Sequence, residues 1–350
     1  MYNEFQKKLD KHLRVAMVGC GAVAEHRHLP ALARRNDCTV VALVDQNGDR
    51  AKDLANRFGR PKVLTDFRDL VTMEIDLAIV AVPNHLHGSV SIELLRAGIH
   101  VLVEKPIALS VADCDNMLQA AEEGHALLAV GMTRRFIHAS RFVKWAIDND
   151  FIGPIHSIDM RDGYAYSWPI TTDFPFRKET AGGGVLMDTG VHTLDQLFWW
   201  MGDVQSFEYY DDNEGGVESE CLLHATLRSK AKVTLELSRN RMLRNTAKIR
   251  GDRGELEVSL LNNTLWIRLL GAPWEVIGGG SPAANGSTAR QSQIDIFQAE
   301  HDDVFDAIRS GRSPAVPGHE TRRSLALIES CYRQRRPLHL PWLQASGSIL

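Results

Sequence analysis

Residues 13–24, LRVAMVGCGAVA, decide the fold of this chain. The first six are apolar apart from one arginine and predict a buried strand, and the last six read G-x-G-x-x-A, a tight turn that opens a helix. Glycine permits the sharp turn and lets a pyrophosphate approach the backbone, while the helix N-terminus offers N–H donors and the positive end of its dipole. We therefore expect a dinucleotide-binding turn whose contacts come from Gly19, Gly21, Ala22 and Val23.

The pattern that follows this turn predicts a whole domain. Short apolar segments alternate with segments that are apolar at helical spacing, and strands separated by helices imply a parallel sheet covered on both faces. We predict an α/β chain that begins with a doubly wound Rossmann domain over residues 1–132. The expected strands are 13–18, 40–44, 77–82, 100–103 and 127–130, and the expected helices are 51–58, 86–97 and 111–122.

Residues 133–350 have a different pattern of apolar and polar residues and are expected to form a second α/β domain. From Val204 to about Val276, long strands with polar alternation follow one another without helices, which predicts a large, open, mostly antiparallel sheet. The remaining expected elements are a flexible loop at Gly278–Ser287 and closing helices at 293–309 and 320–335.

The first closing helix contains a run of metal-ligand residue types, Glu300-His301-Asp302-Asp303. Adjacent residues on a helix point in different directions, so we interpret the run as a solvated helix face. This interpretation sets aside a metal-dependent lyase, and no metal ion is expected.

Composition and charge limit the partners. The 350 residues carry a formal net charge of −4, with 44% apolar and 24% charged residues, which gives no indication of a nucleic-acid or membrane partner. The N-terminal residues lack the apolar core of a secretory signal, and no apolar run approaches the ~20 residues that cross a bilayer. Five cysteines lie far apart with no C-x-x-C pair, as expected of reduced thiols in the cytoplasm.

The second expected strand ends at Asp45, 21 residues beyond Ala24. A carboxylate at this distance accepts the ribose hydroxyls of an adenosine and repels a 2′-phosphate. The alternative is a solvated acidic residue at a strand end. We expect NAD as the cofactor, with NADP less favoured, although Asn47 and Arg50 nearby could reshape the pocket.

Two further segments follow strands of the parallel sheet, Pro83-Asn84-His85-Leu86-His87 and Glu104-Lys105-Pro106. Open α/β sheets bind ligands at the carboxyl ends of their strands, so the candidate cofactor contacts here are Pro83, Asn84, His87, Glu104 and Lys105. A lysine directly after a buried strand is costly unless its ammonium is solvated or paired. Lys105 is therefore a functional candidate, with an exposed loop lysine as the alternative.

The glycine triplet Gly182–Gly184 precedes a stretch with apolar residues at helical spacing. On that helix Asp188 and His192 are four residues apart and share a face. A carboxylate beside an imidazole can orient and tune a general base. A surface pair is the ordinary alternative, but the glycines let another group approach the backbone and so favour a site.

In these features the chain resembles the Gfo/Idh/MocA oxidoreductases, the family of glucose–fructose oxidoreductase and inositol dehydrogenase, over nearly its whole length. The resemblance also covers Arg134-Arg135-Phe136 and Gly153-Pro154-Ile155, and it departs mildly at Ala24, where a third glycine is frequent. It implies a Rossmann domain followed by an α/β domain whose open sheet often makes oligomer contacts.

The resemblance also implies an activity, NAD(P)-dependent hydride transfer at a hydroxyl or carbonyl carbon of a sugar, cyclitol or related polyol. Around the reacting carbon, His192 would exchange the hydroxyl proton, Lys105 would bond the same oxygen, and Asp188 would position the substrate or the histidine. The expected substrate contacts are these three residues and Arg135, together with Tyr164 and Trp168 of an aromatic loop at which the chain departs from the family pattern.

Two rival functions fit the same residues. A nucleotide-ketosugar reductase would use them in the reducing direction, and a dinucleotide-sensing regulator would keep the cofactor site without turnover. The aromatic loop Tyr164–Arg177 suits the apolar faces of a sugar ring, and it could equally pack against a partner subunit. We expect a homodimer or homotetramer that acts on a small molecule.

Overall fold

The computed structural model describes residues 11–169, 173–271, 276–279 and 291–339. The chain divides into two compact units, each assembled from separate stretches of sequence. The first unit comprises Met1–Phe136, Pro169–Phe174 and Gln291–Ala326, and the second comprises Ile137–Trp168, Pro175–Arg290 and Leu327–Leu350. The first boundary lies close to the expected division at residue 132, but residues 291–326 belong with the N-terminal unit.

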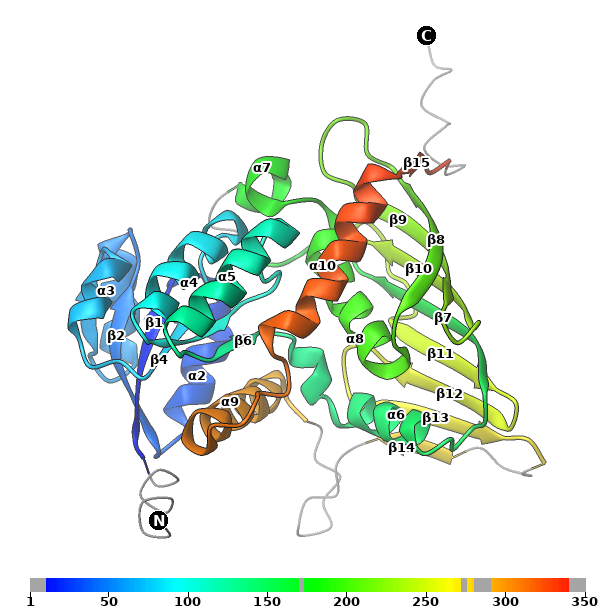
Figure 1. Ribbon diagram of the computed structural model, residues 1–350, viewed down its shortest axis with the longest axis horizontal. Coiled ribbons are helices and arrows are strands. Elements are labelled where there is room, and N and C mark those ends of the chain that lie inside the picture. Colours follow the sequence, from blue (N-terminus) through cyan, green and yellow to red (C-terminus); the bar gives the residue numbers. More distant parts are fainter. Residues whose placement is uncertain (1–10, 170–172, 272–275, 280–290, 340–350) are drawn as a thin grey trace. The chain divides into compact units, whose positions relative to one another are not determined.

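The first unit is built on a six-stranded parallel sheet with the strand order β3-β2-β1-β4-β5-β6 (Figure 1). Its strands are β1 (Leu13–Val18), β2 (Cys38–Val44), β3 (Lys62–Leu64), β4 (Leu77–Val80), β5 (His100–Val103) and β6 (Leu128–Val130). The order runs outward from β1 in both directions, so right-handed crossovers place the connecting helices on opposite faces. The central strand β4 is accordingly buried along its whole length. The predicted doubly wound fold is confirmed.

Helices and helical turns connect these strands. They are η1 (Ala24–His28), α2 (Leu29–Ala33), α3 (Gly48–Arg57), η2 (Phe67–Thr72), η3 (Asn84–Leu86), α4 (His87–Arg96), α5 (Val111–Glu123) and η4 (Thr133–Phe136). The Asn47 side chain accepts a hydrogen bond from Arg50 N at 3.2 Å, and Ser110 accepts one from Asp113 N at 3.0 Å. Each cap satisfies an N–H group that the first helical turn leaves without an intrahelical partner.

The first unit is completed by α9 (Gln293–Ser310), which begins at a capping box of Ser292 and Asp295. Val304 and Phe305 of this helix are buried in the same apolar cluster as residues of β1, α2 and α3. Residues far apart in sequence therefore share one core.

The interpretation of Glu300-His301-Asp302-Asp303 as a solvated face is wrong for its first two residues. Glu300 and His301 are 1% and 0% exposed, whereas Asp302 is exposed. The physical reason is that α9 packs against η1, α2 and η4 together, so that a wide arc of the helix is covered.

The second unit is built on a nine-stranded sheet with the order β14-β13-β12-β11-β7-β10-β9-β8-β15. Neighbouring strands pair antiparallel, except that β10 pairs with β7 and β15 with β8 in parallel. The strands are β7 (Ile155–Gly163), β8 (Val204–Asp211), β9 (Glu220–Leu227), β10 (Lys232–Ser238), β11 (Thr246–Gly251), β12 (Gly254–Ser259), β13 (Thr264–Leu269), β14 (Val276–Gly279) and β15 (Arg336–Pro337). The expected large, mostly antiparallel sheet is confirmed.

Helices α6 and α8 cover one face of this sheet (Figure 1). The helical elements of this part of the chain are α6 (His138–Asp148), η5 (Phe174–Phe176), α7 (Lys178–Ala181), η6 (Leu186–Gly190), α8 (Val191–Met201) and, after Ala326, the end of α10 (Gly318–Arg333). Gln196 Nε2 and Trp200 Nε1 of α8 donate to the side chain and the carbonyl of Ser140 on α6, each at 3.1 Å. These bonds fix η6 and α8, which carry two of the candidate residues.

Gly278 and Gly279, which were expected to begin a flexible loop, are the last residues of β14, and the loop from residue 280 to 287 lies outside the described residues. None of the helices in the described ranges is long and apolar enough to cross a membrane.

Candidate functional site

In the turn after β1, glycine occupies two positions for different physical reasons. Gly19 has φ +97°, and a Cβ on it would lie 2.4 Å from the carbonyl oxygen of Ala81, so the protein itself requires glycine there. A Cβ on Gly21 would meet nothing within 4 Å. Glycine at this second position is therefore not needed for packing, and its open face suits the close approach of a pyrophosphate. Ala22 and Val23, both half-buried, begin the helix that continues through η1.

Asp45, directly after β2, faces this turn. Its Oδ2 accepts a hydrogen bond from Cys20 N at 2.9 Å and its Oδ1 accepts one from Asn47 N at 2.8 Å. Each carboxylate oxygen keeps a lone pair for a further donor, as a ribose hydroxyl would require. Arg50 Nη1 lies 3.8 Å from Oδ2 and brings a positive charge to the same place. Burial raises the pKa of Cys20 to about 12, with Asp45 adding to the effect, so no thiolate faces the turn.

Pro83 and Asn84, after β4, are half-buried at the carboxyl end of the sheet, but His87 is 1% exposed. Its Nδ1 lies 2.7 Å from the carbonyl oxygen of Pro106 and its Nε2 lies 2.9 Å from that of Val82. Burial lowers the pKa of His87 against the opposing effect of these two carbonyls. The ring is thus used in joining the loops after β4 and β5.

Glu104, after β5, also points inward. Its Oε1 accepts from His28 Nε2 at 3.0 Å and its Oε2 from Lys105 N at 3.1 Å. Burial alone would raise the pKa of Glu104, but the His28 hydrogen bond and the charge of Lys105 hold it below its usual value. His28 was not among the residues expected from the sequence.

Lys105 differs from the residues around it. From Val101 to Ala108 every residue is buried except Lys105, which is half-buried. The segment therefore presents one polar side chain at the carboxyl end of the sheet, as the functional interpretation of Lys105 requires.

The helical stretch in the second unit shows the same pattern. From Gly183 to Phe198 every residue is buried except Asp188 and His192, which are half-buried. The i, i+4 spacing thus places the two polar side chains on one accessible stripe of an otherwise buried helix.

The glycines before this helix are explained by the chain itself. A Cβ on Gly184 would lie 1.8 Å from the carbonyl oxygen of Glu218, and one on Gly183 would lie 2.0 Å from Tyr332 Oη. The Glu218 carboxylate accepts from Gly184 N at 2.8 Å and from Leu186 N at 2.9 Å. The group that the glycines admit is therefore an internal helix cap, and these glycines are not evidence for a bound ligand.

Arg239 is a site residue that the sequence pattern had not indicated. It directly follows β10 and is 6% exposed, and its Nη2 lies 3.4 Å from Asp188 Oδ2. Its guanidinium also lies over the Tyr166 ring, with Cζ 5.4 Å from the ring centroid. Within the described residues its Nε and Nη1 make no hydrogen bond. Asp188 is thus paired with a buried cation.

Of the other expected substrate contacts, Tyr164 and Trp168 lie in the second unit after β7. Tyr164 is half-buried and its N–H donates to the Ser238 carbonyl at 3.2 Å, while Trp168 is 41% exposed. Arg135, in the first unit, is only 2% exposed, and its Nη1 donates to the Ala315 carbonyl at 3.1 Å and to Glu320 at 2.5 Å. Its guanidinium forms a buried ion pair with the start of α10, and its contact with the substrate stays a prediction.

Two family models match this chain. Residues 13–132 match an oxidoreductase family with an NAD-binding Rossmann fold, and residues 144–343 match the C-terminal alpha/beta domain of an oxidoreductase family. The D-glucoside 3-dehydrogenase of Escherichia coli is 30% identical over 215 residues, which is 60% of this chain and 60% of that relative. The matched region therefore spans less than two thirds of the relative.

Solved structures share the fold over almost the full length. The WlbA dehydrogenase of Bordetella pertussis, in complex with NADH and UDP-GlcNAcA, has a TM-score of 0.80 at 22% identity and covers 93% of this chain and 96% of its own. KijD10, a 3-ketoreductase of Actinomadura kijaniata in complex with NADP and TDP-benzene, has a TM-score of 0.80 at 22% identity and covers 94% and 99%.

Proposed function

Because the chain belongs to the Gfo/Idh/MocA family of oxidoreductases, we propose that it transfers hydride between NAD and a hydroxyl-bearing carbon of a sugar, cyclitol or related polyol. The pyrophosphate binds over Gly21, and the Asp45 carboxylate accepts the adenosine ribose hydroxyls. Pro83 and Asn84 line the same edge of the sheet. His87 and Glu104 support the site from within, because their polar atoms are occupied by protein partners.

In this proposal Lys105, Asp188 and His192 act on the same carbon. The bound dinucleotide accepts the hydride when the alcohol is oxidised. His192 takes the hydroxyl proton in oxidation and returns it in reduction, as neutral imidazole suits exchange near neutral pH. Lys105 hydrogen-bonds the same oxygen and favours its anionic form. Asp188, paired with Arg239, positions the substrate or the histidine, and Tyr164 and Trp168 contact the substrate ring.

The observation that carries the proposal is the exposure pattern of the two buried segments. In each, a long run of buried residues leaves accessible only the polar side chains that the chemistry uses, Lys105 in one and Asp188 with His192 in the other. Structural packing does not require such side chains there, because a charged residue within a buried run costs free energy unless it is solvated or paired.

The test is a turnover assay with NAD and NADP over a panel of free sugars and cyclitols, followed by His192→Asn. Asparagine keeps a hydrogen-bonding side chain but cannot accept a proton near neutrality. The variant should bind NAD normally, lose about two to four orders of magnitude in turnover and lose the low-pH limb of the rate profile. The exposed His224 of β9 provides a matched control as His224→Asn. Near-normal turnover of a folded His192→Asn protein with an unchanged pH profile would refute the assignment.

A nucleotide-ketosugar reductase is the second candidate, favoured by the full-length likeness to a 3-ketoreductase. It would oxidise NADH or NADPH only when given a nucleotide-linked ketosugar and would leave free polyols untouched. Tight dinucleotide binding with no turnover on either panel would instead identify a dinucleotide-sensing regulator.

We also propose a cytoplasmic homodimer or homotetramer. All five cysteines are free thiols, which suits a reducing compartment. Light scattering after size exclusion tests the oligomer directly.

A further inference from the structure

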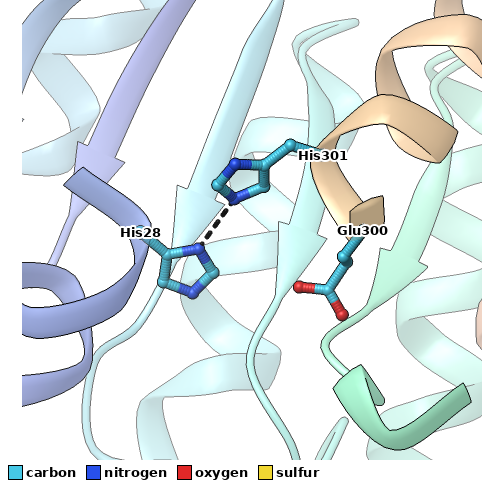
Figure 2. A group of neighbouring side chains, drawn as sticks. All are labelled: His28, Glu300 and His301. Carbon is cyan, nitrogen blue, oxygen red and sulfur yellow. Dashed lines mark hydrogen bonds between the residues drawn. The ribbon is translucent and has the colours of Figure 1, made fainter. Parts of the chain in front are cut away.

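A cluster of three ionisable side chains lies inside the first unit, outside the residues that the proposed function uses. His28 comes from η1, and Glu300 and His301 come from α9 (Figure 2). One ligand-type atom of each lies within 4.8 Å of the other two, and the three residues are 0%, 1% and 0% exposed. The two histidines, 273 residues apart in the chain, thus meet at this cluster.

Glu300 is the member that the surrounding protein does not explain. Neither of its carboxylate oxygens makes a hydrogen bond within the described part of the chain. A buried carboxyl group without partners costs free energy, and such a group often marks a water molecule or an ion.

His28 is oriented as a metal-binding histidine would be. Its Nε2 lies 3.0 Å from Glu104 Oε1, an acceptor, so Nε2 carries the proton and Nδ1 presents its lone pair. That Nδ1 lies 3.0 Å from His301 Nε2 (Figure 2). Metal-ligating histidines almost always donate their second N–H in this way to a carboxylate or carbonyl, which fixes the tautomer and the ring.

We propose that His28 Nδ1, His301 Nε2 and the Glu300 carboxylate bind one divalent transition-metal ion, zinc in the first place. Two imidazoles and a carboxylate are ligands that zinc prefers, at about 2.0–2.2 Å, and tetrahedral ligands at that range are about 3.3 Å apart. The two nitrogens already lie 3.0 Å apart. The carboxylate, within 4.8 Å, closes the remaining gap by side-chain rotation. A water molecule or the second Glu300 oxygen completes the shell.

The metal-free alternative has a definite form. His301 Nε2 would donate its proton to His28 Nδ1, and Glu300 would be a protonated acid without an acceptor. With the metal bound, His301 Nδ1 would carry the proton and, unlike His28 Nε2, it has no acceptor within the described residues; without the metal it would be an unpaired acceptor. A metal ion or a buried water molecule would give the Glu300 carboxylate the partner that the described residues do not provide, and the metal content distinguishes the two.

The ion would hold α9 to η1 and, through His28, fix the Glu104 carboxylate that precedes Lys105. It would be a structural ion inside one unit, and no step of the proposed hydride transfer passes through it. It replaces the sequence-based expectation that no metal is bound, and it stands or falls independently of the proposed activity.

The experiment measures metal content in the whole chain, expressed in zinc-supplemented medium, freed of any affinity tag and desalted. Elemental analysis should find about one zinc per chain, and cobalt-supplemented growth should give the visible absorption of a low-symmetry Co²⁺ site. Glu300→Gln, which keeps the shape and removes the charge, and His301→Gln should each lose the ion. The control Asp302→Asn changes the adjacent, exposed carboxylate and should keep it.

The metal content of the wild-type protein tests the proposed site even if a variant fails to fold. Less than about 0.1 zinc per chain, with no cobalt absorption and no change of the unfolding temperature on chelation, would overturn the proposal. Equal metal content in wild type and in folded Glu300→Gln and His301→Gln would overturn it as well, because the ion would then lie elsewhere.

Discussion

Alanine at Gly21 and alanine at Gly19 should have opposite effects, although the two glycines are neighbours in one turn. A Cβ on Gly21 would meet no atom within 4 Å and the residue does not have a positive φ, so Gly21→Ala should fold normally and gain up to about 1 kcal/mol from the lower entropy of the unfolded chain. Gly19→Ala must adopt φ +97° and place a methyl group 2.4 Å from the Ala81 oxygen. The left-handed conformation costs about 1–2 kcal/mol and the overlap about 1–3 kcal/mol more.

NADH binding should be more sensitive to Gly21→Ala than folding stability is. The Gly21→Ala methyl group would occupy the space that we assign to the pyrophosphate, and the loss of one hydrogen bond to a charged phosphate is worth about 1.5–3 kcal/mol. This corresponds to roughly a 10- to 100-fold weaker NADH affinity. Thermal unfolding and an NADH titration measure the two effects separately. An NADH affinity of Gly21→Ala equal to that of wild type would show that the pyrophosphate does not bind over this turn.

Three further substitutions test the remaining assignments. Lys105→Ala should leave NAD affinity nearly unchanged while turnover falls about a hundredfold or more, since the group stabilises developing charge; retained activity in steady-state assays would make it a loop lysine. Asp45→Ser should shift the ratio of kcat/KM toward NADP by at least about tenfold, or about 1.4 kcal/mol, and a wild type that already prefers NADP would contradict the assignment. Burial alone would raise the pKa of Asp37, but Arg35 and Arg309 together lower it below its usual value. The contribution of Asp37 to folding stability is therefore present above the pKa of the unfolded state and is lost as the pH falls through the lower pKa of the folded state. Asp37→Asn should therefore be destabilised near neutral pH and show a shallower loss of unfolding free energy on acidification, measured by denaturant titration.

Local patterns were sufficient for most of the first unit. The strands β1 and β5 lie at their expected residues, and the helix expected at 111–122 is α5, because each is determined by a run of apolar residues at one spacing. β3 carries little signal, since it has three residues at the sheet edge and only Leu64 is buried.

Long-range packing is what the sequence pattern could not supply. The burial of Glu300 and His301 follows from η1 and η4, which are more than 150 residues away, and nothing near position 300 encodes that contact. Arg135 likewise looked available for a ligand, and it is buried because its partner Glu320 lies on α10. A polar residue in a helix or turn is therefore ambiguous until the element that covers it is known.

Arg239 is a different kind of omission, because its signal was present in the sequence. Lys105 drew attention as a basic residue just after the buried strand β5, and Arg239 comes directly after β10. A buried guanidinium costs more free energy than a half-buried ammonium unless a carboxylate accompanies it, so the rule applies to Arg239 with greater force. Applied evenly along the chain, that argument selects Arg239 but also Arg228, which directly follows β9 and is exposed, so it is the burial of Arg239 and its pairing with Asp188 in the structure that separate the two.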